Sequence, residues 1–201
     1  FFINSYHYST FFPAEINGPL WSIGLEVSCY LLLPIVLFLI IKSVKKLSHA
    51  IASLVGSIVL LQLLNPLIIN TFMTSNVSKG WQYGLTGGAK QWLPYWNINT
   101  FFAQFLCGSL AALIIVALRS RGTAQSRNFD VAAVFFGVTA IWLVAGRLVV
   151  GAPDPLTDQP YVAPFYAILM AAVLVASAFS TIIYKALDNR VFRWIAKLSF
   201  S

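Results

Sequence analysis

Long apolar runs, separated by short polar stretches, dominate the pattern of this chain. A helix needs about 20 mainly apolar residues to cross the roughly 30 Å of hydrocarbon in a bilayer. Five runs reach this length, and we expect each to form a membrane-spanning helix. They cover approximately residues 20–41, 50–69, 100–118, 131–150 and 162–184. The pattern therefore predicts an all-α fold, a polytopic membrane helix bundle with five transmembrane helices in a single domain.

Composition supports a membrane protein over a soluble one. Hydrophobic residues make up 59% of the 201 positions and charged residues only 9%, whereas a soluble domain carries roughly 25% charged residues. Disorder and a disulfide scaffold fit poorly with these values. The net charge of +7 arises from 13 Lys and Arg against 6 acids, and the positions of these cations indicate membrane topology rather than a nucleic-acid partner.

Ten of the 13 cations fall in alternate connections between the predicted spans or after the last one, and only Lys79, Lys90 and Arg147 lie elsewhere. Short loops rich in Lys and Arg stay on the cytoplasmic side of a membrane. We therefore expect residue 1 outside and residue 201 in the cytoplasm, with the lipid bilayer as the first partner of the chain. We also expect the membrane to be a bacterial inner membrane. The ten cations of the expected inner segments are Lys42, Lys45, Lys46, Arg119, Arg121, Arg127, Lys185, Arg190, Arg193 and Lys197.

Glu26 is the one acid inside the body of a predicted span. A charged group at that depth costs on the order of a few kcal/mol and usually serves a function. Ser22 and Tyr30 lie four residues before and after it, so the hydroxyls and the carboxyl share one helix face, which we expect to point into the bundle. Trp21 stands at the outer end of the span, where Trp anchors an interface. Two hypotheses remain: Glu26 is an orienting or proton-handling carboxylate, or it is a buried acid that only hydrogen-bonds neighbouring helices or stays protonated.

Three segments resemble the acyltransferase 3 family of integral-membrane O-acyltransferases. Residues 17–26 read Asn-Gly-Pro-Leu-Trp-Ser-Ile-Gly-Leu-Glu and are followed at 30–34 by Tyr-Leu-Leu-Leu-Pro, similar to the defining motif of that family. Residues 105–112, Phe-Leu-Cys-Gly-Ser-Leu-Ala-Ala, and residues 192–201, Phe-Arg-Trp-Ile-Ala-Lys-Leu-Ser-Phe-Ser, resemble two further family elements in the same order. The second acid, the Gln and the Phe that many members carry after the motif glutamate are replaced here by Val27, Ser28 and Cys29.

The resemblance implies a reaction and its participants. An acyl group, often acetyl, passes from cytoplasmic acyl-coenzyme A, a co-substrate rather than a bound cofactor, to a hydroxyl of a glycan, glycolipid or other small acceptor. The catalytic His of the family belongs to a preceding helix, so Glu26 would orient that base or handle its proton. We therefore expect residues 1–201 to be the central part of a larger membrane domain, lacking helices on both sides and inactive alone.

Two weaker sets of candidate residues follow from chemistry and position. Arg119, Arg121, Arg190 and Arg193 could meet the phosphates of coenzyme A, although topology and anionic lipid explain them equally. Trp81, Trp92 and Trp96 could stack on an acceptor sugar, although interface anchoring also suits them. The spacing of His, Cys and acids predicts no metal site, and the sequence leaves the oligomeric state open.

Two other classes of protein compete with the enzyme. A transporter or permease core could use Glu26 to bind a proton or substrate, but no inverted repeat or broken helix pair is evident. A noncatalytic membrane subunit would use the same residue only for helix contacts.

Overall fold

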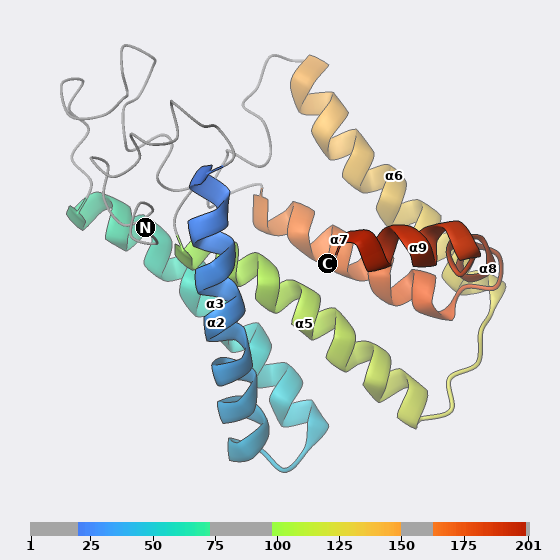
Figure 1. Cartoon of the computed structure of the whole chain (residues 1–201), viewed down its shortest axis with the longest axis horizontal. Coiled ribbons are helices and arrows are strands. Elements are labelled where there is room, and N and C mark those ends of the chain that lie inside the picture. Colours follow the sequence, from blue (N-terminus) through green and yellow to red (C-terminus); the bar gives the residue numbers. More distant parts are fainter. Residues whose placement is uncertain (1–19, 73–97, 150–162, 200–201) are drawn as a thin grey trace.

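The computed structural model describes residues 20–72, 98–149 and 163–199, in which every regular element is a helix (Figure 1). The all-α prediction is therefore confirmed. The helices are α2 (Leu20–Ser43), α3 (Leu47–Phe72), α5 (Ile98–Ser120), α6 (Arg127–Val149), α7 (Ala163–Phe179), α8 (Ile182–Leu187) and α9 (Arg190–Ser199).

Within the described ranges, four helices have the length and apolar composition to cross a membrane. Their membrane-compatible parts are Ile23–Ser43, Leu47–Asn65, Ile98–Ser120 and Arg127–Gly146. The fifth, α7, is a shorter apolar helix of 17 residues, about 25 Å long at 1.5 Å per residue. The chain is accordingly an integral membrane protein of helical spans.

The fifth apolar run ends earlier than we predicted. We expected a helix to about Tyr184, but α7 stops at Phe179 and α8 begins at Ile182. The Ser180 hydroxyl donates to the Ser177 carbonyl oxygen at 2.9 Å and accepts the Tyr184 N–H at 2.7 Å. These bonds replace the regular helical ladder at the break. Hydropathy alone could not reveal it, because the apolar residues continue on both sides.

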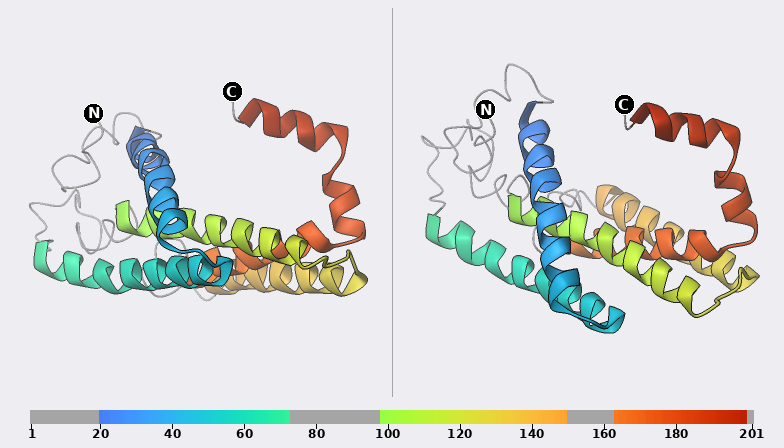
Figure 2. Two further views of the ribbon diagram at one scale, coloured as in Figure 1. Left: turned by 90° about the horizontal axis from the view of Figure 1, so that it is seen from below. Right: turned by 60° about the horizontal axis from the view of Figure 1, so that its bottom comes forward.

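Helices α3, α5, α7 and α6 form a layer, and α2 crosses it (Figure 2). Figure 1 shows α7 lying between α5 and α6, to both of which it packs. In both views of Figure 2, α2 and the α8–α9 segment stand on the same side of this layer. The helix α5 contacts α2, α3 and α7 and is thus the central element of the bundle.

The best-buried core lies where α2, α3 and α5 meet. Its fully or nearly fully buried members are Cys29, Leu54, Ile58, Phe102, Leu106 and Cys107. Small residues line the contact of α6 with α7, where Ala133, Ala140 and Ala176 are buried and allow close backbone approach. By contrast, Trp142 is 70% exposed and Val131 69%, as suits side chains that face lipid.

A glycine turn ends α5 and starts the connection to α6. Gly122 has a φ of 72°. This left-handed conformation costs glycine little free energy, because glycine has no Cβ. Its N–H donates to the Arg119 carbonyl at 3.0 Å, and the Thr123 N–H donates to the Leu118 carbonyl at 3.1 Å. This is the hydrogen-bond pattern with which many helices end, and it keeps the connection short.

Truncation at the core of the bundle tests this packing. We expect Leu106→Ala, at a side chain with no exposed surface, to lower the free energy of unfolding by roughly 2–3 kcal/mol, the lower part of the range for buried leucines. Leu63→Ala on α3, at a residue that is 69% exposed, is the matched control and should change it little. Reversible unfolding in mixed detergent micelles measures both values, and equal losses would contradict the assigned core.

Candidate functional site

Glu26 lies in the second turn of α2, partly buried at the edge of the helix contact. The fully buried neighbours on this helix are Leu25 and Cys29, which are four residues apart and face the bundle. Among the residues that the structure describes, none forms a hydrogen bond or ion pair with the Glu26 carboxylate. A carboxylate in this position has its charge uncompensated by the described spans, which is unusual for an acid within a membrane.

Tyr30 shares the helix face of Glu26, as its spacing predicts, but that face lies at the edge of the bundle rather than inside it. The Tyr30 side chain is 58% exposed, and its ring meets the Phe105 ring of α5 edge-on, with centroids 5.5 Å apart. The difference arises because each residue turns a helix by 100°, so that burying Cys29 moves Tyr30 to the margin. The side chains of Trp21 and Ser22 lie outside the described part.

The proposed donor-binding cations belong to two separate segments. Arg119 and Arg121 are exposed at the end of α5, and Arg190 and Arg193 are exposed on α9. Arg193 is already paired, since its Nε donates to Asp188 Oδ1 at 2.8 Å, and this bond raises the pKa of the guanidinium further above its ordinary value. The three tryptophans expected to meet the acceptor, Trp81, Trp92 and Trp96, lie outside the described residues.

A cavity of about 260 Å³ lies between α5 and α7. Three of its lining residues carry polar groups, namely the Gln104 amide, the Cys107 thiol and the Tyr166 hydroxyl. The amide and the phenol can each donate to and accept from a ligand hydroxyl. Our sequence analysis did not select Tyr166, although a hydroxyl inside an apolar run is a usable signal. Glu26 does not line this cavity.

Asp130 is the acid that our sequence analysis missed, and it joins α6 to α8. Its Oδ2 accepts the Thr181 hydroxyl at 2.6 Å and the Thr181 N–H at 3.0 Å. Its Oδ1 accepts the N–H groups of Ile182 at 2.9 Å and Ile183 at 3.2 Å. A carboxylate satisfies the free N–H groups at the start of a helix in this way. Asp130 therefore fixes the point at which α8 and α9 leave the bundle.

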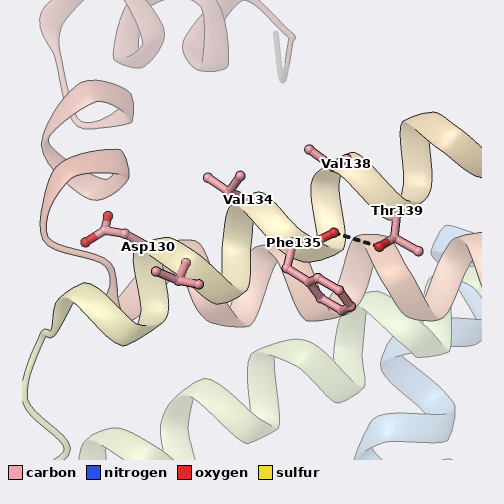
Figure 3. A pocket seen from close by; sticks show the side chains of 6 residues that line it. Asp130, Val134, Phe135, Val138 and Thr139 are labelled. Carbon is pink, nitrogen blue, oxygen red and sulfur yellow. Dashed lines mark hydrogen bonds between the residues drawn. The ribbon is translucent and has the colours of Figure 1, made fainter.

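Figure 3 shows Asp130 on α6 beside α8, at one end of an open apolar surface formed by α6. Farther along this surface, the Thr139 hydroxyl donates to the Phe135 carbonyl oxygen at 2.7 Å and so needs no other partner. Across the described ranges, no three His, Cys, Asp or Glu side chains gather in a way that could hold a metal ion.

Removing the Asp130 carboxylate tests its link to α8. We expect Asp130→Ala to loosen the start of α8 and to raise the rate of tryptic cleavage after Lys185 and Arg190 severalfold, because three backbone N–H groups lose their acceptor. Cleavage of the protein in inside-out vesicles, followed by mass spectrometry, measures the rate. Asp154→Ala removes an acid elsewhere in the chain and serves as the control. Equal rates in the wild type and Asp130→Ala would show that the link does not restrain α8.

No family model, curated protein or solved structure matches this chain. The resemblance to the acyltransferase 3 family therefore rests on residues 17–26, 30–34, 105–112 and 192–201 alone.

Proposed function

We propose that this chain is part of a bacterial inner-membrane acyltransferase that moves an acyl group from cytoplasmic acyl-coenzyme A to an acceptor hydroxyl. The acceptor belongs to a glycan, a glycolipid or another small molecule. The observation that carries the proposal is the Glu26 carboxylate, which ends the Pro-Leu-Trp-Ser motif, lies within a span and has no partner among the described residues. An acid held there without compensation is expensive and therefore points to a function.

The fold brings two of the three family-like segments together. Tyr30 of the first segment and Phe105 of the second are in ring contact. Cys29, which directly precedes Tyr30, and Cys107 of the second segment are both members of the buried core cluster. Segments about 75 residues apart in the chain thus form one local structure around the helix that carries Glu26, as expected if they serve a common site.

The chemistry required is the activation of a weak nucleophile. A base removes the proton of the acceptor hydroxyl, the oxygen attacks the thioester carbonyl, the C–S bond breaks, and the coenzyme A thiolate leaves and takes up a proton. A histidine suits the base at neutral pH. Glu26 would accept the hydrogen bond from the other ring nitrogen of that histidine and so fix its tautomer and orientation.

The position of Glu26 at the margin of the α2–α5 contact supports this role. A carboxylate in the fully buried core could reach only the described helices, whereas Glu26 is partly exposed beside the exposed Tyr30. That side of α2 can accept a further helix that bears the base. On the proposal, Arg119, Arg121 and Arg190 lie at the donor side, and the tryptophans at 81, 92 and 96 lie at the acceptor side.

Glu26→Gln tests the proposal in the intact protein in membrane vesicles supplied with labelled acyl-coenzyme A. We expect the rate of acyl transfer to fall by about 10²–10⁴, the contribution typical of a positioned acid–base group, because Gln cannot stabilise a histidinium. Glu26→Asp should restore part of the rate. The amount of protein in the membrane should be unchanged.

The matched control is Glu15→Gln, which neutralises the other glutamate of the chain and should leave transfer near the wild-type rate. Transfer by Glu26→Gln at the parental rate would remove the carboxylate from the mechanism. Net movement of substrate across the vesicle membrane without acyl transfer would instead identify a transporter, and neither activity would favour a noncatalytic subunit.

A further inference from the structure

A groove of about 310 Å³ runs along α7 between α5 and α6, and only apolar residues line it. Figure 1 shows the three helices that form it side by side. The floor on α7 consists largely of alanines, including Ala171, Ala172 and Ala176, whose side chains are too short to fill the space between the neighbouring helices. The larger walls come from Leu110 and Ile114 on α5 and from Phe129 and Phe136 on α6.

The chemistry of the groove restricts its occupant to hydrocarbon. Water requires two to four polar partners, and the lining side chains offer none. An empty groove would forfeit the dispersion contacts of its walls. Ile168 on its lining is 52% exposed, so the groove opens to the outside of the bundle, where the membrane supplies acyl chains.

Cations that no described carboxylate pairs with lie at the end of the groove where Phe129 is located. Arg119, Arg121 and Arg127 are exposed in or beside the α5–α6 connection, and in the described part of the chain no carboxylate pairs with them. Asp130, the acid nearest to them in sequence, directs its oxygens to α8 instead. Arg121 directly follows Ser120, the last residue of α5, and so stands at the same end of the helix pair as Phe129 near the start of α6.

We propose that this groove is a binding site for an anionic phospholipid of the membrane leaflet at the cationic end of the bundle. One acyl tail occupies the space between α5, α6 and α7, and the arginines of the α5–α6 connection bind the phosphate. Basic pockets between spans commonly hold anionic headgroups in this way. The lipid fills the gap between two helices that α7 separates, and so strengthens the bundle. Binding of this lipid does not require the acyl-transfer reaction, although Arg119 and Arg121 also belong to its proposed donor side.

Native mass spectrometry of the intact protein, released from micelles that contain equal phosphatidylglycerol and phosphatidylcholine of the same chains, tests the site. The wild type should retain more phosphatidylglycerol than phosphatidylcholine. Ala172→Phe fills the groove and should lower retention of both lipids severalfold. Arg121→Gln combined with Arg127→Gln should abolish the preference for phosphatidylglycerol.

Two controls match these variants. Ala112→Phe adds the same bulk at an exposed position of α5 that lines none of the described cavities, and Lys45→Gln with Lys46→Gln removes two cations from the α2–α3 connection. Both should bind lipid as the wild type does. Unchanged binding by the groove and arginine variants would overturn the proposal. If the arginine variant lost lipid binding and Ala172→Phe did not, the lipid would contact the protein through its headgroup only. That result would also overturn the proposal.

Photo-crosslinking of the wild type keeps the test decisive if Ala172→Phe does not fold. A phosphatidylglycerol with a diazirine in its tail should label peptides containing residues 110–114, 129–136 and 168–176 above all others. Labelling spread evenly over exposed apolar positions such as Val138 and Trp142 would contradict a specific site. A dimer joined through the groove, with no lipid in it, would assign the groove to a second copy of the chain and overturn the proposal.

Discussion

The absence of hydrogen-bond partners in hydrocarbon is the constraint on which this structure depends. Every polar group that enters the bilayer must be satisfied by the protein itself. The hydroxyls within the spans follow this rule locally: Ser28, Ser57, Ser109 and Thr139 each donate to the carbonyl four residues earlier, at distances between 2.7 and 3.1 Å. The same constraint makes any polar group without a partner conspicuous.

Two carboxylates illustrate opposite responses to this constraint. Asp130, at the end of a span, accepts four hydrogen bonds, two from Thr181 and two from the first N–H groups of α8. Its negative charge therefore stabilises the junction between α6 and α8. Glu26 has no such bonds within the described helices. The Gln62 Oε1 atom is buried and also lacks a donor in the part of the chain that the structure describes, but an uncharged amide tolerates this at lower cost than a carboxylate does. The contrast makes Glu26 the stronger candidate for chemistry.

Much of the fold could be predicted from hydropathy, because a span is defined by length and apolar content. The four long helices begin and end within a few residues of the expected limits. The break at Ser180 could not be predicted, since apolar residues continue on both sides and the carboxylate that caps the following helix, Asp130, comes from another helix. The burial of individual faces was also hard to predict in helices that are apolar all round: Cys29 faces the core and Tyr30 the margin, yet both are surrounded by similar residues in the sequence.

The candidate site likewise has a part that the sequence predicts and a part that depends on helix packing. The importance of Glu26 follows from its charge and position in a span, whereas its lack of a described partner and its place at the edge of the α2–α5 contact required the fold. Tyr166 and Gln104 were not selected from the sequence because their proximity across α5 and α7 depends on helix packing.

Reaction of the intact protein with a hydrophobic carbodiimide, which modifies carboxyl groups inside membranes, tests the central claim most directly. The extent of modification at Glu26, mapped by mass spectrometry, should rise in parallel with the loss of acyl transfer, and acyl-coenzyme A together with acceptor should slow both. Complete modification of Glu26 with transfer undiminished would show that this carboxylate takes no part in the reaction.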